Sequence, residues 1–311
     1  MDLTWDDDAE RRTVAISRAS AVGATVSRNS LLWHRIEPTR GQRDWNLVDA
    51  VVTELEANGI EPLFTVYGSP SWANGVGGEV PMHYAYVPTS DSAYQEWLDQ
   101  FVDFIAEGAQ RYRGRVRWEI WNEQNEPSFW KPTPDAGRYR EMYERSRAAI
   151  RATDPGAQVA VGGLAGLAFT GPGGISGRDY LNQLLGAGLR PDAVAIHPYA
   201  SKHQGPSTDL PWENNFSDVG LIANLIASKD LVVPLWVTEW GWWASAVGEQ
   251  AQADHLAASL ALLRDDHPSV TLATYFIDYD RPGYSSGLFD EALAPKPAAA
   301  AFAAFAPSFS G

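Results

Sequence analysis

The sequence is organised around the stretch Trp118-Glu119-Ile120-Trp121-Asn122-Glu123-Gln124-Asn125-Glu126-Pro127. Its first part belongs to the apolar run Arg115 to Trp121, which is rich in Val, Ile and Trp and is typical of a β-strand. The strand leads directly into a cluster of amides and carboxylates. In an α/β barrel the carboxyl ends of the strands carry the catalytic groups, so we expect Asn122 and Glu123 to lie in an active site.

A second stretch has the same design. Pro234-Leu235-Trp236-Val237-Thr238-Glu239-Trp240-Gly241-Trp242 is an apolar run that ends in one Glu and continues into Gly and aromatic residues. Two strands that each deliver one Glu at the carboxyl end favour the paired-carboxylate chemistry by which glycosidic bonds are cleaved.

Strand-like and helix-like segments alternate along the chain, which predicts βαβ crossovers and a parallel sheet. The predicted strands are Ala24–Arg28, Glu61–Tyr67, Arg115–Trp121, Gln158–Gly162, Ala193–His197, Leu235–Glu239 and Val270–Phe276. The predicted helices are Asp6–Val22, Asn46–Ala57, Ala93–Ala109, Ala136–Thr153, Arg178–Leu185, Leu221–Ser228, Ala251–Leu263 and Ala298–Phe305. We therefore predict an α/β fold of the (β/α)8 or TIM-barrel type, with residues 1–311 forming one catalytic barrel domain.

The pattern gives seven strands, whereas a closed barrel needs eight. The missing strand should precede the first helix, where Leu3-Thr4-Trp5 is the available segment, so barrel strand one is either short or missing. A doubly wound open sheet would accept seven strands, but its usual Gly-rich phosphate turn after the first strand is not visible.

Composition excludes several classes of partner. The chain has 39 acidic and 24 basic residues and a net charge of −15, which argues against binding to nucleic acid. It has no run of about 18 apolar residues that would predict a membrane span. There is no Cys, and the six His residues do not have ligand spacing, so we expect neither a catalytic metal nor another cofactor. Cellular location and oligomeric state stay undetermined.

The two Glu motifs carry a family resemblance. Trp121-Asn122-Glu123-Gln124-Asn125 resembles the Trp-Asn-Glu-Pro-Asn motif of the clan A retaining glycoside hydrolases, and Thr238-Glu239-Trp240-Gly241 resembles their nucleophile strand, with family 39-like barrels as the nearest relatives. The resemblance implies that Glu123 is the acid/base and Glu239 the nucleophile. Asn125-Glu126-Pro127 also matches a form of the motif, but we prefer Glu123 because it follows the strand directly.

The same resemblance implies roles for further residues. Asn122 would contact the sugar 2-hydroxyl, and Arg28 would keep the nucleophile ionised. His197-Pro198-Tyr199 resembles the clan's His-x-Tyr, in which Tyr199 bonds the nucleophile and His197 shapes the surroundings of the acid. Clan members often place a Trp at the end of the last strand, where this chain has Tyr275-Phe276-Ile277-Asp278-Tyr279.

Many Trp residues lie at or beyond predicted strand ends, where indole faces could stack on sugar rings. They are Trp33, Trp72, Trp130, Trp212, Trp240, Trp242 and Trp243, of which we expect three or four to touch a ligand. Trp45, Trp97, Trp118 and Trp236 are instead expected in the core.

The predicted function is that of a retaining glycoside hydrolase that acts on an oligo- or polysaccharide, with a carbohydrate as the partner. Two alternatives use the same features. A carbohydrate-binding barrel without turnover would keep the aromatic residues and tolerate loss of either Glu, and a transglycosylase would use the same two Glu residues with a sugar acceptor in place of water.

Overall fold

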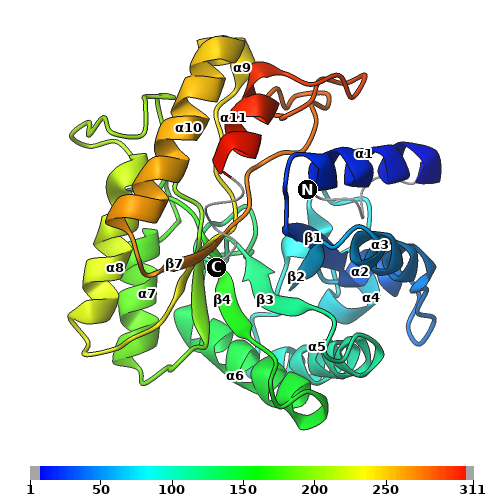
Figure 1. The fold of residues 1–311 in the computed structure, drawn as a ribbon. Coiled ribbons are helices and arrows are strands. Elements are labelled where there is room, and N and C mark those ends of the chain that lie inside the picture. The colour runs from blue at the N-terminus through cyan, green and yellow to red at the C-terminus, as the bar shows by residue number, and fades with distance from the viewer. Residues whose placement is uncertain (1–7, 306–311) are drawn as a thin grey trace.

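The computed structural model describes residues 8–305. Seven strands form one sheet in chain order, and every neighbouring pair is parallel. The strands are β1 Val26–Leu32, β2 Glu61–Tyr67, β3 Arg117–Asn122, β4 Val159–Leu164, β5 Ala193–Ile196, β6 Leu235–Val237 and β7 Val270–Ala273. The sheet curls into a barrel with the strands inside and the helices around them (Figure 1), which confirms the predicted (β/α)8 class.

The helices alternate with the strands as predicted. They are α1 Ala9–Ala21, α2 Trp33–Ile36, α3 Asn46–Ala57, α4 Ser71–Asn74, α5 Asp91–Arg111, α6 Ala136–Thr153, α7 Gly177–Gly186, α8 Val219–Ala227, α9 Ala244–Val247, α10 Glu249–Asp266 and α11 Pro297–Phe305, with two 3-10 turns at His83–Ala85 and Phe216–Asp218. None of the helices in residues 8–305 combines the length and apolar character needed to cross a membrane.

Two predictions at the N-terminal side need correction or fall outside the described residues. Strand β1 is Val26–Leu32, not Ala24–Arg28, so Arg28 lies inside the strand and not at its end. The polar composition of β1 made its bounds difficult to predict. The strand tolerates these polar residues because the side-chain amide of Asn29 donates hydrogen bonds to Ser27. The segment after Leu32 begins with the short helix α2. The predicted strand segment Leu3–Trp5 lies outside the described residues.

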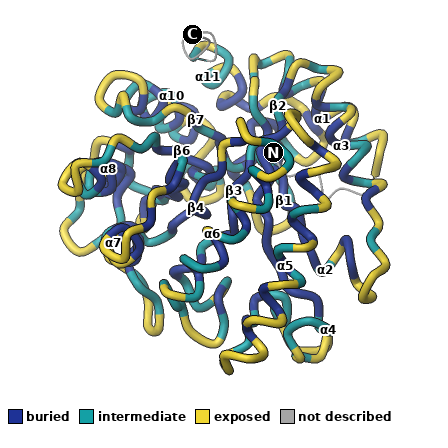
Figure 2. The backbone as a smooth tube through the Cα atoms, turned by 90° about the horizontal axis from the view of Figure 1, so that it is seen from below, coloured by how far each residue is buried: buried dark blue, intermediate teal, exposed yellow. Residues whose placement is uncertain are grey.

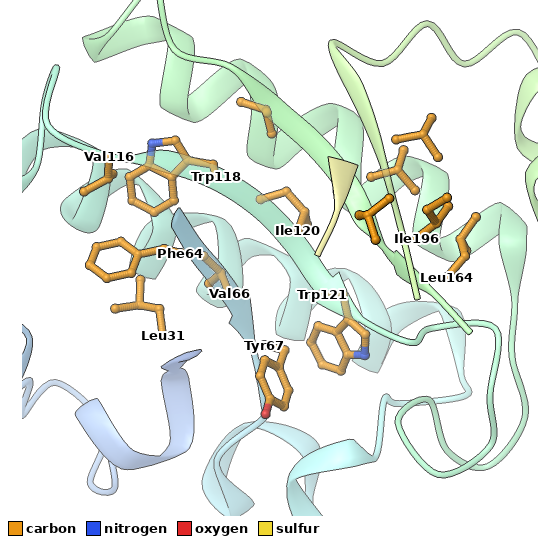
Figure 3. Close-up of a cluster of buried hydrophobic side chains, with 14 of the residues drawn as sticks. Leu31, Phe64, Val66, Tyr67, Val116, Trp118, Ile120, Trp121, Leu164 and Ile196 are labelled. Carbon is orange, nitrogen blue, oxygen red and sulfur yellow. The ribbon is translucent and has the colours of Figure 1, made fainter. Parts of the chain in front are cut away.

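Apolar side chains fill both sides of the sheet. Figure 2 shows buried residues gathered around the strands and exposed residues on the outer helices and loops. Outside the barrel wall, side chains such as Phe64, Trp118 and Ile120 pack toward the helices (Figure 3). Inside, Trp236 packs with Leu63, Leu272 and three small Ala residues, so one large ring fills the narrow interior. The prediction that Trp45, Trp97, Trp118 and Trp236 are core residues is confirmed.

Candidate active site

The two predicted catalytic carboxylates meet at the carboxyl ends of the strands. Glu123 follows β3 directly, and Glu239 follows β6 after Thr238. Each side chain is about one sixth exposed, at 17% and 16%. One carboxylate oxygen of Glu123 and one of Glu239 lie within 4.8 Å of each other and of a His197 ring nitrogen. Both carboxylates border one cavity.

This cavity has a volume of about 410 Å³ and is mainly aromatic. It is lined by Arg28, Ser30, Tyr67, Met82, Tyr84, Asn122, Glu123, Phe129, Tyr199, Thr238, Glu239, Trp243, Thr274, Tyr275, Phe276, Ile277 and Tyr284. Its size is within the range of small-molecule sites, and the mixture of aromatic faces with a few polar groups is what such sites use to orient a ligand.

Glu239 is held as a carboxylate. The Arg28 guanidinium donates to Oε1 at 2.5 Å, and the Tyr199 hydroxyl donates to Oε2 at 3.1 Å. Burial alone would raise the pKa of Glu239, but the positive charges of His197 and Arg28 and the two hydrogen bonds outweigh burial, so the pKa is lowered. The same burial, together with the charge of Glu239, raises the pKa of Tyr199 well above its usual value, so its hydroxyl keeps the proton that it donates.

Glu123 is paired with His197. The Nδ1 atom of His197 lies 2.8 Å from Oε1 of Glu123, and Nε2 lies 3.2 Å from the Thr238 hydroxyl. Burial of the imidazole lowers its pKa, but the charge of Glu239 and the bond to Glu123 more than compensate, and the pKa of His197 is raised. The His197 ring thus contacts Glu123 and lies close to the charge of Glu239, so it links the two carboxylates.

The ring of His197 requires a glycine on the neighbouring strand. A Cβ atom at Gly163, on β4, would lie 2.0 Å from Nε2 of His197. The backbone of Gly163 also supports Glu123, because its carbonyl accepts a hydrogen bond from the Glu123 amide at 2.9 Å.

Glu119 was not predicted as a site residue, but it binds Arg28. Its carboxylate is fully buried and accepts from Nε and Nη2 of Arg28 at 3.1 and 3.0 Å and from the Gly163 amide at 2.9 Å. This pairing leaves Nη1 of Arg28 for Glu239, and Nη2 also donates to Oδ1 of Asn122 at 2.8 Å. The signal was a charged residue in an apolar strand, since a buried carboxylate requires a charged partner.

A break in strand alternation brings Glu119 and Asn122 to the same side. Trp121 has a left-handed backbone with φ 71°, and Glu123 has φ 46°. Trp121 therefore packs outward against Trp97 and Phe101 of α5, although the alternation would point it inward. Bulky residues rarely adopt positive φ, and such strain is concentrated at functional sites.

Most of the Trp residues predicted as candidate sugar contacts lie away from this cavity. Among the described residues that line the cavity, Trp243 is the one indole, and five of the other candidates do not line it: Trp33, Trp72, Trp130, Trp240 and Trp242. Four of these five, all except Trp72, are at most 2% exposed.

Hydrogen bonds explain why these indoles can be buried. The indole N–H groups of Trp33 and Trp72 donate to the side chain and the carbonyl of Glu37, and those of Trp240 and Trp242 donate to Ser259 and to the Gln204 carbonyl. Four of the five indoles thus satisfy their polar edge within the protein, which is what a loop anchor requires.

The other predicted site residues do gather at the cavity. Arg28, Asn122, Tyr199 and Tyr275 line it, and His197 lies directly behind Glu123. Three further aromatic residues form part of the cavity wall and were not predicted as site residues: Tyr84, Phe276 and Tyr284. Nothing in the sequence distinguishes them from the other aromatic residues.

A metal ion could be held by Glu123, His197 and Glu239, because their donor atoms are close enough together. The Arg28 guanidinium that bonds Glu239 already supplies a positive charge at this place, so a cation would have to compete with it. The donor set therefore fits a proton-transfer site better than a metal centre.

Solved structures of similar fold come from glycoside hydrolases. A family 39 glycoside hydrolase from Bacteroides cellulosilyticus WH2 superposes with a TM-score of 0.72 at 23% identity, over 97% of this chain and 61% of that chain. A family 39 β-xylosidase from Caulobacter crescentus superposes with a TM-score of 0.70 at 20% identity, over 94% of this chain and 67% of that chain. The barrel is thus of the kind that clan A glycoside hydrolases share, as the two Glu motifs predicted.

Sequence comparison gives the family. The model described as cellulase (glycosyl hydrolase family 5) matches residues 1–275, so this chain belongs to that family. The chain is also 28% identical to a β-xylosidase from Geobacillus stearothermophilus over 165 residues, which are 51% of this chain and 31% of that protein. The match spans 31% of the length of that β-xylosidase, and this chain covers 61% of the Bacteroides enzyme, so it is shorter than these relatives.

Proposed function

We propose that this protein is a retaining glycoside hydrolase in which Glu239 is the nucleophile and Glu123 is first the acid and then the base. The observation that carries the proposal is the pair of carboxylates facing one cavity, with oxygens within 4.8 Å of each other. Retaining enzymes hold the two carboxyl groups about 5–5.5 Å apart, whereas inverting enzymes need roughly 6.5–9.5 Å to admit a water molecule between carboxylate and sugar. The short separation favours direct attack.

In the first step an oxygen of Glu239 forms a bond to the anomeric carbon while the bond to the leaving oxygen breaks. The proton of Glu123 passes to the leaving oxygen, which departs as a hydroxyl group. Arg28 and Tyr199 keep Glu239 ionised for the attack, and each carboxylate oxygen retains a lone pair beyond the one that accepts their bond.

In the second step Glu123 takes a proton from water, and the water oxygen attacks the anomeric carbon. The ester bond breaks and Glu239 leaves as a carboxylate. Glu123 can act as the base at this stage because it gave up its proton in the first step. His197 lies between the two carboxylates, with ring nitrogens 2.8 Å from Glu123 and 3.8 Å from Glu239.

Two further features support sugar binding. Arg28 engages Oδ1 of Asn122, so the Nδ2 donor of Asn122 is the end that can reach a sugar hydroxyl in the cavity. Tyr275 and Phe276 at the end of β7 offer aromatic faces to a ring. Because one relative is a β-xylosidase, we propose a xylose-configured substrate as the first to test.

Glu126, the alternative acid, has a different environment. Its Oε1 accepts from the Thr170 hydroxyl at 2.5 Å, and it does not contribute to the cavity lining. Burial raises the pKa of Glu126 against the effect of that hydrogen bond. A raised pKa suits an acid, but Glu126 has no access to a bond held beside Glu239, so we assign the role to Glu123.

The test is chemical rescue. The wild type is screened on aryl glycosides, beginning with an aryl β-xyloside, and Glu239→Gly and Glu123→Ala are then assayed with and without azide. We expect both variants to lose at least about a thousandfold in kcat/KM. Glu239→Gly should yield the glycosyl azide of inverted configuration and Glu123→Ala that of retained configuration.

Each other outcome has a meaning. Turnover that survives both substitutions would refute the assignment, and a wild type that binds sugars but cleaves no glycoside would point to a carbohydrate-binding barrel. Glu126→Gln serves as the matched control and should keep most of the activity. Product analysis with added sugar acceptors separates hydrolysis from transglycosylation.

A further inference from the structure

An exposed aromatic pair lies on the rim of the barrel outside the cavity. Trp212 is 84% exposed and Phe169 is 39% exposed, and their ring centroids are 6.2 Å apart. Phe169 is on the segment that follows β4, and Trp212 is on the segment that follows β5, so both lie at the carboxyl-terminal face. An indole this exposed is unfavourable in water unless it serves a contact.

The pair is held together by one side chain. Oδ1 of Asn214 accepts from the amides of Ala168 and Phe169 at 3.0 and 2.9 Å, and Nδ2 donates to the Phe169 carbonyl at 2.8 Å. Asn214 thereby ties the Phe169 segment to the Trp212 segment. Rings that are fixed before a ligand arrives lose less entropy on binding.

The Phe169 segment is attached to residues that directly follow Glu123. Asn125 donates to the carbonyls of Ala165 and Ile175 at 2.7 and 2.8 Å, and Glu126 accepts from the Thr170 hydroxyl. The aromatic pair is therefore coupled in position to the proposed acid.

The cavity and the aromatic pair use different residues. The cavity lining comes from β1, β2, β3, the segments that follow β2, β3, β6 and β7, and Tyr199, but from none of the residues 165–175. The sugar that is attacked must occupy this cavity, next to Glu239. Glu123 must face the leaving oxygen, and the residues that follow Glu123 are bonded to the Phe169 segment, so the leaving group is expected to extend toward that segment.

We propose that Phe169 and Trp212 form a carbohydrate-binding platform for the leaving-group side of the substrate, which rests on the proposed function. The ligand is a neutral oligosaccharide chain whose C–H faces stack on the two rings. The net charge of −15 disfavours an anionic glycan at the same place. The enzyme would thus act within or near the end of a chain of several sugars, and small aryl leaving groups would not reach the platform.

The experiment compares a short and a long substrate, namely an aryl β-xyloside and xylotetraose, or the matching pair of whichever sugar the wild type cleaves fastest. Trp212→Ala and Phe169→Ala should each lower kcat/KM on the tetrasaccharide about tenfold, through KM. Both variants should stay within about twofold of wild type on the aryl glycoside. Val232→Ala removes an apolar side chain that is even more exposed, on the loop before β6, and should change neither value.

Two results would overturn the proposal: an unchanged value on the tetrasaccharide, or an equal fall on both substrates, which indicates a structural role. If the wild type cleaves no glycoside, the proposed function fails independently. In that case xylotetraose is added to wild type and to Trp212→Ala, and binding is measured from the change in indole fluorescence. If the platform binds sugar, the loss of Trp212 should weaken binding about tenfold.

Discussion

At the scale of single residues, the site depends on Arg28, whose one guanidinium group binds several acceptors. Arg28 donates to Glu119 through Nε and Nη2, to Asn122 also through Nη2, and to Glu239 through Nη1. Burying two carboxylates and one guanidinium is costly unless each is paired. The buried Glu119 is therefore what fixes the guanidinium in the orientation that Glu239 needs.

Tyr199→Phe tests how Glu239 is kept ionised. The substitution removes the O–H donor to Oε2, and because that donor lowers the pKa of Glu239, its loss raises the pKa. The nucleophile is active when ionised, so the acidic limb of the kcat/KM profile should move to higher pH. At the optimum kcat/KM should fall about 10- to 100-fold, as expected for a hydrogen bond to a charged group.

The matched control is Tyr284→Phe, another hydroxyl of the cavity wall. It should leave the acidic limb unchanged. If Tyr199→Phe loses rate without moving that limb, the hydroxyl positions the substrate and does not tune Glu239.

At the scale of elements, neighbouring strands determine where each catalytic group stands. Gly163→Ala on β4 places a Cβ 2.0 Å from Nε2 of His197, so the imidazole must move away from Glu123. We expect kcat/KM to fall at least about a hundredfold and the free energy of unfolding to fall by about 1–3 kcal/mol from overpacking.

Urea denaturation and circular dichroism establish that the variant is folded before its rate is interpreted. Gly171→Ala is the control, since a Cβ there meets nothing within 4 Å. A Gly163→Ala enzyme that is folded and fully active would show that the His197 contact to Glu123 is dispensable.

The elements themselves were largely predictable. Asn46–Ala57 and Ala136–Thr153 begin and end where the apolar periodicity predicted, and the second is capped by Asp135, which accepts from the Arg138 amide. The carboxyl ends of β5, β6 and β7 came out shorter than predicted. Residues beyond those ends turn from the sheet to line the cavity, and their composition is still that of a strand.

The face that a residue presents was less predictable than its element. Glu123 and Glu239 could be assigned because a charged residue ends an apolar strand in each case. Trp240 follows Glu239 directly, but both lie beyond the end of β6, and the Trp240 ring packs on Tyr275 and donates to Ser259. Glu119 was missed although it is a charged residue in an apolar strand, and the left-handed backbone at Trp121, which brings Asn122 to the same side as Glu119, has no signature in the sequence.

At the scale of the whole molecule, the balance of titrating groups sets the pH range of stability. Ion pairs lower the pKa values of the carboxyl groups of Asp49, Glu56 and Asp179, so their contribution is lost when pH falls through those lowered values. The neutral side chain of His34 affects the stability of the folded state at a higher pH than these carboxyl groups do. Burial, with smaller effects from His83 and Arg35, lowers its pKa from 6.5 to about 4.

The direction of the His34 effect follows from proton uptake. Between pH 6.5 and about 4 the unfolded chain binds a proton at His34 that the folded protein does not, so the stability of the folded state falls as pH falls through this window. We expect a loss of about 2 kcal/mol from this group, measured by urea denaturation at pH 6.5 and 4.5.

In His34→Phe, which preserves a ring stacked on Tyr84, the pH dependence in this window should become shallower. Tyr84→Leu removes the same stacking without removing the titrating group and should keep the wild-type slope. Equal slopes in wild type and His34→Phe would mean that other, partly buried histidines, such as His255 and His267, carry the effect, since burial lowers their pKa values as well.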